Sequence, residues 1–272
     1  MKINLLIMGL IALSLLSCNN KTKTKEKPHI AKKIEIRIAT TDGSHDVFAY
    51  LTRRLLTEKG YHISIIKVKD GIEAIKDNQA DIYLSQWVPI NSNREVDSLV
   101  DLGNIYDDAF YGLVVPKYMK INSISELPTI KEKLKGEIYS IKSRKKVYSY
   151  LETTIKAYNL PYKPAELTVE MFEDFYMKRN DFCYTGMYPH PMLNTNFLKF
   201  LDDPKSVGAR FNIVKYGTTS WCDSFPEIKK QIASIKLNTK DYNMLVEEMG
   251  KNNWEYKKSI DSWYQRVKKN FK

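Results

Sequence analysis

The order of strand and helix patterns constrains the fold of this chain most strongly. Residues 34–39 alternate apolar and polar side chains, which is typical of a strand, and 46–59 space their apolar residues as a helix does, up to Gly60. The alternation then continues with strand, helix and strand patterns at 61–68, 71–78 and 80–84. Strands that alternate with helices form parallel sheets covered by helices, so the order predicts an α/β fold.

A second set of these patterns lies between two apolar strands, predicted at 110–116 and 211–216. It holds strand patterns at 136–141 and 182–185 and helix patterns at 147–158 and 171–178. Three more helices close the chain, at 225–236, 239–249 and 253–267. We therefore predict two lobes joined by a hinge near Val114–Pro116 and Phe211–Tyr216. Lobe 1 combines 34–115 with 217–272, and lobe 2 is 116–216.

The first 17 residues have the composition of a signal peptide. The apolar run from Ile3 to Leu16 is shorter than the ~20 residues of a membrane span, and Leu15-Leu16-Ser17-Cys18 resembles the bacterial lipobox. The lipobox resemblance implies that Cys18 becomes the lipidated N-terminus of an envelope protein, in the periplasm or on the outer face of the cytoplasmic membrane. The alternative is an ordinary signal peptide with an incidental cysteine.

The basic character of the chain is concentrated in its tails. The formal net charge is +11, of which residues 21–33 carry six Lys against one Glu. These residues show no apolar period, so we expect 18–33 to be a flexible, solvated tether. A lysine-rich tail near anionic lipid accounts for the charge better than nucleic acid does in an exported chain.

The sequence contains no enzyme signature that we recognise. A Gly-x-Gly-x-x-Gly or Walker-type loop and a Gly-x-Ser-x-Gly elbow are missing, and no Cys-x-x-Cys occurs. Cys183 and Cys222 lie in apolar or aromatic contexts that are typical of buried thiols. We predict a binding protein without catalysis, metal or cofactor.

Aromatic residues follow three predicted strands. Trp87 follows the strand at 80–84, Tyr188 follows that at 182–185, and Trp221 follows that at 211–216. Ligands of open α/β sheets bind beyond the carboxyl ends of strands, and aromatic faces attract quaternary ammonium groups. The three rings therefore indicate a cation cage, and the alternative is that each packs in the core of a lobe.

The turn Asp42-Gly43-Ser44-His45 opens the predicted helix at 46–59. Its free backbone N–H groups could hold a carboxylate, which makes Gly43 and Ser44 candidate ligand residues. His45 could add a donor, and His190 is a further candidate from the other lobe. For His45, the alternative is a plain residue of an N-terminal turn.

Four stretches together resemble the glycine betaine, proline betaine and choline type of ABC transporter substrate-binding proteins. They are 79–89 (QADIYLSQWVP), 111–119 (YGLVVPKYM), 198–205 (LKFLDDPK) and 223–227 (DSFPE). The resemblance runs from about residue 34 to the C-terminus. It implies a type II periplasmic-binding fold, in which two lobes close on a small zwitterionic or cationic solute and present it to a membrane permease. Trp87 matches a tryptophan of the family.

Two departures from the family pattern bear on the ligand. Where the family places tryptophans after Thr185-Gly186, this chain has Met187 and Pro191. Methionine is polarizable but has no ring quadrupole. A basic run stands at 142–146, where the family often has small residues. At the start of a helix such a run favours binding of an anion. The alternative is that these residues form a solvated face outside the cleft.

We expect the ligand between Trp87 of lobe 1 and Met187 with Tyr188 of lobe 2, with Trp221 joining them. The first hypothesis is an importer component for a quaternary-ammonium solute. The second is a protein of the same fold with a changed ligand, such as an amino acid or another zwitterion or anion, that acts as a sensor or interaction protein. An exported hydrolase is a weaker third option, since the nucleophile set is missing.

Cys18→Ser should release the protein from the membrane fraction, because the thiol that would carry the lipid is removed while the tether is unchanged. Fractionation of cells that express the wild type and the variant measures this. Equal membrane retention of the two forms would contradict lipidation at Cys18.

Overall fold

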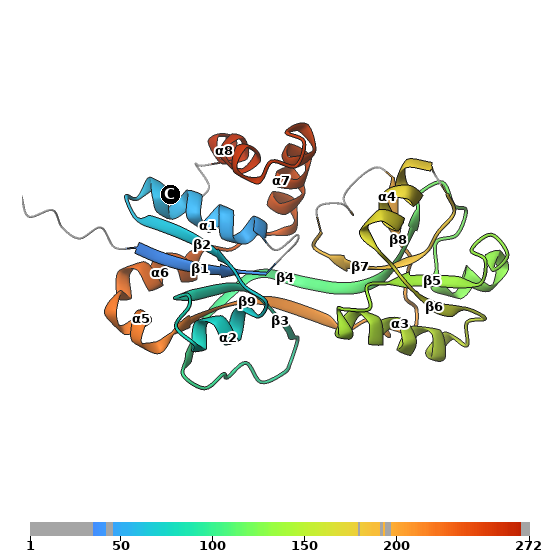
Figure 1. Ribbon diagram of the computed structural model, residues 1–272, viewed down its shortest axis with the longest axis horizontal. Coiled ribbons are helices and arrows are strands. Elements are labelled where there is room, and N and C mark those ends of the chain that lie inside the picture. The colour runs from blue at the N-terminus through green and yellow to red at the C-terminus, as the bar shows by residue number, and fades with distance from the viewer. Residues whose placement is uncertain (1–34, 42–45, 179, 191–192, 194–196, 268–272) are drawn as a thin grey trace, which may run out of the picture. The chain divides into compact units, whose positions relative to one another are not determined.

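The computed structural model describes residues 35–41, 46–178, 180–190, 193 and 197–267, all within the unit that spans residues 34–272 (Figure 1). The predicted signal peptide, Cys18 and the tether lie outside the described residues, as do Gly43, Ser44 and His45. No described helix is long and apolar enough to cross a membrane.

Nine strands of the described chain form one sheet, in the order β2-β1-β3-β9-β4-β7-β5-β6, with β8 paired to β4. The strands are β1 (Glu35–Thr40), β2 (His62–Lys67), β3 (Ile82–Pro89), β4 (Leu99–Pro116), β5 (Glu137–Ser140), β6 (Lys163–Glu166), β7 (Tyr184–Tyr188), β8 (Leu198–Phe200) and β9 (Arg210–Thr218). The predicted α/β fold is confirmed. The sequence patterns did not predict β6 and β8.

The first half of the sheet is parallel, as the alternating patterns predict. Strands β2 and β3 both pair in parallel with β1, and the crossovers between these strands are α1 (Asp46–Glu58) and α2 (Gly71–Lys76). Asp81, beside the start of β3, accepts hydrogen bonds from the Arg37 backbone N–H (2.7 Å) and from Arg37 Nη2 (2.8 Å). This aspartate of the Ala80-Asp81 motif therefore ties β3 to β1.

Gly71, the first residue of α2, is required by close packing. A Cβ atom at this position would lie 2.3 Å from the Tyr83 ring. The side chain of Asp70 caps the helix by accepting hydrogen bonds from the backbone N–H groups of Ile72 (2.9 Å) and Glu73 (3.1 Å). Together these contacts fix the chain that leaves β2 against β3.

The second half of the sheet repeats the pattern. Strands β6 and β7 pair in parallel with β5, and the helices of this half are α3 (Lys145–Tyr158), α4 (Val169–Lys178) and the 3-10 helix η1 (Ile124–Ile130).

Strands β4 and β9 connect the two halves (Figure 1). β4 pairs antiparallel with β9 from Leu99 to Phe110, and then with β7 from Phe110 to Val114. We predicted that this strand starts at residue 110, yet it starts at Leu99 and has 18 residues. Its early part contains Gly103 and Asp108, which resemble a turn in sequence. Both have positive φ, and each lies within a register shift of the ladder with β9.

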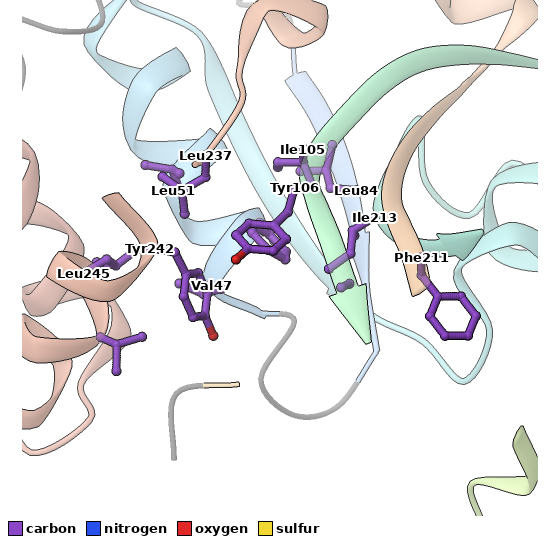
Figure 2. Close-up of a cluster of buried hydrophobic side chains, with 14 of the residues drawn as sticks. Val47, Leu51, Leu84, Ile105, Tyr106, Phe211, Ile213, Leu237, Tyr242 and Leu245 are labelled. Carbon is purple, nitrogen blue, oxygen red and sulfur yellow. The ribbon is translucent and has the colours of Figure 1, made fainter. Parts of the chain in front are cut away.

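The largest hydrophobic cluster extends through β4 into both halves. In the first half it joins α1, β3, β4, β9 and α7 (Thr239–Lys251), as Figure 2 shows for Leu51, Tyr106, Ile213 and Leu245. Leu151 of α3 belongs to the same cluster in the second half. The two halves therefore share one continuous core beside the crossing strands.

The end of the chain forms four described helices where we predicted three. They are α5 (Thr219–Ser224), α6 (Pro226–Ser234), α7 (Thr239–Lys251) and α8 (Tyr256–Val267). The missed helix, α5, is short and starts directly at the end of β9, where Thr218 Oγ1 accepts a hydrogen bond from the Trp221 backbone N–H at 3.3 Å. Helix α8 packs on α1 and α7, which returns the C-terminal segment to the first half.

Lys215 of β9 is a fully buried cation that is held by a helix end. Its Nζ donates hydrogen bonds to the carbonyl oxygens of Ile232 (2.9 Å), Ala233 (2.9 Å) and Ile235 (2.6 Å) at the C-terminus of α6. Carbonyl oxygens at this end of a helix carry its negative dipole end, and the Ile232 oxygen also accepts a hydrogen bond from the Ile235 backbone N–H at 3.1 Å. Burial lowers the pKa of Lys215 to about 8.

Lys215→Met should lower the free energy of unfolding by about 1–3 kcal/mol, because three carbonyl groups at the end of α6 lose the hydrogen bonds that Lys215 donates. Between pH 8 and about 10 the unfolded chain binds more protons than the folded one at this residue, so wild-type stability should rise with pH relative to the variant. Urea denaturation at pH 7.5, 9 and 10 measures both effects. Lys230→Met, an exposed change on α6, should stay within about 0.5 kcal/mol of wild type. Parallel pH curves for wild type and Lys215→Met would contradict the prediction.

Candidate functional site

A cavity of about 1130 Å³ is lined by residues from both halves of the sheet. The first half contributes Thr41 after β1, Lys67–Lys69 at the end of β2, and Trp87 of β3. The second half contributes residues 143–147 at the start of α3 and Met187 of β7. Since parallel strands carry their carboxyl ends to the same edge, loops from distant parts of the sequence meet here.

Trp87 is the aromatic wall of this cavity. Its ring stacks on that of Tyr111 of β4, with centroids 5.3 Å apart, and meets the edge of Phe211 of β9 at 5.4 Å. We predicted Trp87 beyond the end of its strand, but it lies within β3 and pairs with Ile213. The strand is longer than its apolar pattern because the long partner β9 supplies hydrogen bonds as far as Pro89.

Met187 lines the cavity from the opposite half. It lies opposite Tyr111 in the ladder of β7 and β4, and Arg144 Nη1 lies 3.5 Å from its Sδ. Trp87 and Met187 are therefore two predicted site residues that the structure brings to the same cavity.

Tyr188, the next residue of β7, does not line this cavity. Successive side chains of a strand face opposite sides of the sheet, and Tyr188 stacks on Phe110 at 5.3 Å. Its hydroxyl donates a hydrogen bond to Asn243 Oδ1 at 3.3 Å. Trp221 also lies elsewhere: it is buried in α5, with its ring 5.7 Å from that of Phe225. For both residues, contact with a ligand stays a prediction.

Tyr188 belongs to an aromatic cluster that the sequence did not indicate. The rings of Tyr106 and Tyr242 each lie 6.2 Å from it and 5.5 Å from each other. Tyr106 and Tyr242 lie close together in the core (Figure 2). Tyr106 shares a hydrogen bond of 3.1 Å with Thr239, whereas the buried Tyr242 hydroxyl has no hydrogen-bond partner among the described residues. Burial raises the pKa of both tyrosines, so both are neutral. Tyr106 escaped prediction because its segment has the composition of a turn.

A second cavity, of about 840 Å³, shares Ser143, Arg144, Val147 and Met187 with the first and is also lined by His190. Burial and the neighbouring Arg144 lower the pKa of His190 to about 4, so the imidazole is neutral near pH 7. His190 can therefore act there as a neutral hydrogen-bonding group. Pro191, the position of the second missing tryptophan, lies outside the described residues.

The predicted thiols are confirmed as buried. Cys183 and Cys222 are both free, and burial raises the pKa of each. Neither thiol is activated as a nucleophile, which needs a lowered pKa. Among the residues that the structure describes, no group of three His, Cys, Asp or Glu side chains could hold a metal ion.

Comparison with solved structures shows the class of the fold. The chain is similar to lactococcal OpuAC in its closed conformation with glycine betaine, at 22% identity and TM-score 0.73, over 87% of this chain and 97% of that one. It is also similar to the glycine betaine and L-proline binding protein ProX of Borrelia burgdorferi, at 19% identity and TM-score 0.70, over 88% and 95%. The chain is similar, too, to an ABC-transporter choline binding protein in complex with choline, at 16% identity and TM-score 0.68, over 88% of this chain and 90% of that one.

The fold is thus the two-lobe α/β fold of type II periplasmic binding proteins, with a ligand cleft between the lobes. Residues 34–266 match the family described as the substrate-binding domain of the ABC-type glycine betaine transport system, and the chain belongs to this family. The family consists of solute-binding proteins and is not a class of enzymes. A comparison with curated proteins finds no match.

His190 should remain neutral as the pH falls from 7 to 5, because burial and Arg144 both disfavour the imidazolium ion. Its Cε1–H resonance should stay nearly constant over this range in NMR spectra and titrate with a midpoint near pH 4. His190→Gln assigns the signal by its loss. A midpoint near 6.5 would show that the ring is solvated and away from Arg144.

Proposed function

We propose that the chain is the extracytoplasmic solute-binding component of an ABC importer. It binds a quaternary-ammonium solute such as glycine betaine, proline betaine or choline and delivers this solute to the permease. Lipid on Cys18 holds it at the cell envelope, and the basic tether lets the binding domain reach the permease.

The observation that carries this proposal is the Trp87 wall within a cavity lined from both halves. The ring is only half-buried, and its stacking on Tyr111 orients it. A methylammonium group over such a ring gains about 0.5–2 kcal/mol from the cation–π interaction. Membership of the glycine betaine family supports the same class of ligand.

Closure of two lobes is the motion by which such a protein would bind. We propose lobe 1 as residues 34–115 with 217–272, and lobe 2 as 116–216. The cavity walls then belong to different lobes, since Trp87 falls in lobe 1 and Met187 in lobe 2. A ligand between them would favour the closed form by contacting both walls at once.

Met187 favours a second candidate, in which the ligand differs from that of the family. A thioether replaces a ring at this position, so the cation cage is weaker on the side of lobe 2. In this candidate the protein binds an amino acid or another zwitterion or anion and acts as a sensor or interaction protein.

Glycine betaine, proline betaine or choline should raise the melting temperature of the purified protein, and calorimetry then gives the affinity. Trp87→Ala should weaken binding of the best of these ligands by about 1–3 kcal/mol through the lost ring contact and burial. Trp263→Phe is the matched control: it changes a buried tryptophan of α8 that does not line the cavity, so it should lower stability and leave affinity within about twofold.

Two results would contradict the proposal. If none of the three solutes shifts the melting temperature, these solutes are not the ligands of the protein. If Trp87→Ala binds as tightly as wild type, the cavity described here is not the site.

A further inference from the structure

The cavity beside Trp87 is strongly basic. Five of its described lining residues are cations, and they come from both halves: Lys67, Lys69, Arg144, Lys145 and Lys146. No Asp or Glu is among the described residues that line it. Charges of one sign on facing walls raise the local concentration of ligands with the opposite sign. This arrangement opposes a purely cationic ligand such as choline.

Arg144 is the cation whose position is most informative. It lies at the N-cap of α3, is half-buried, and its described contact is with Met187 Sδ. No described carboxylate pairs with it, although Glu166 and Glu173 line the second cavity. An arginine presents a planar fork of donors that fits carboxylate and phosphate oxygens. This fork is available to an anion in the cavity.

Helix α3 adds to the same effect. No side chain caps its first turn, and Lys145 and Lys146 of that turn line the cavity with Arg144. With 14 residues, the helix carries a positive dipole end at this turn. The guanidinium and the helix end thus favour negative charge at one place.

We propose that the cleft selects solutes with net negative charge, whose anionic group binds Arg144 at the start of α3 while an apolar or methylammonium part lies against Trp87. The proposal rests on the proposed function and narrows its ligand class. A trimethylammonium compound that carries a phosphate monoester fits both walls. Glycine betaine, with one carboxylate, interacts less favourably with the cations of the cavity. Choline has no anionic group to pair with them.

Three probes that share the trimethylammonium group separate charge from shape: choline, glycine betaine and phosphocholine. In calorimetry at pH 7.5 and low salt, the affinity for phosphocholine should be about tenfold or more higher than that for glycine betaine, and choline should bind most weakly. The phosphodiester glycerophosphocholine, the equivalent group of a lipid, should bind more weakly than phosphocholine since its net charge is zero. Affinity for phosphocholine should also fall as salt is added.

Arg144→Gln should weaken the binding of phosphocholine about tenfold or more and leave the affinity for choline within about twofold of wild type. Lys142→Gln is the matched control, because it removes one charge from the same loop at an exposed residue that lines neither cavity. It should change each affinity less than threefold. Arg144→Lys keeps the charge and should retain part of the preference, which guards against a glutamine variant that fails to fold.

The outcomes separate the two proposals. If choline or glycine betaine binds as tightly as phosphocholine, or if Arg144→Gln and Lys142→Gln behave alike, the preference for anions is overturned and the proposed function stands. Tighter binding of glycerophosphocholine than of phosphocholine also overturns the preference. If no trimethylammonium probe binds, the proposed function itself fails.

Discussion

Strand β4 is the element on which the rest of the structure depends. It pairs with β9 over its first part and with β7 and β8 over its last part, so it belongs to both halves of the sheet. Between Asp101 and Ala109 its ladder with β9 shifts register three times, and Gly103 and Asp108 adopt positive φ there. Such shifts bend and twist a strand. They lie just before Phe110, where the pairing partner changes.

The candidate site is built directly on these crossing strands. Trp87, Tyr111 and Phe211 come from β3, β4 and β9. Their rings pack against one another, with centroids 4.7–5.4 Å apart. Aromatic pairs of this kind contribute about 0.5–1.5 kcal/mol each beyond burial. The wall that would hold a ligand is therefore a continuation of the core at the junction of the halves.

Lys215 and Arg144 are two cations of this fold that differ in their hydrogen-bond partners. The ammonium group of Lys215 donates to three carbonyl oxygens at the end of α6, so its donors are used within the protein. The guanidinium of Arg144 contacts the Met187 thioether, and no described carboxylate forms an ion pair with it. Burial lowers the pKa of both groups. The first arrangement stabilises the fold, whereas the second leaves donors for a ligand.

The sequence by itself determined the α/β class, the two sets of strands and helices, and two cavity residues, Trp87 and Met187. Apolar periodicity is a local property, and the motif around Trp87 spans a single strand, so both can be recognised without tertiary contacts. Only the tertiary structure decided that Tyr188 turns away from Met187 and that Trp221 packs in the core, because strand register and a short helix at the end of β9 set these directions. It also decided that β4 extends back to Leu99 through a turn-like segment and that Arg144 lines the same cavity as Lys67 and Lys69. Long-range pairing can override local composition, and it brings together charges that lie far apart in the chain.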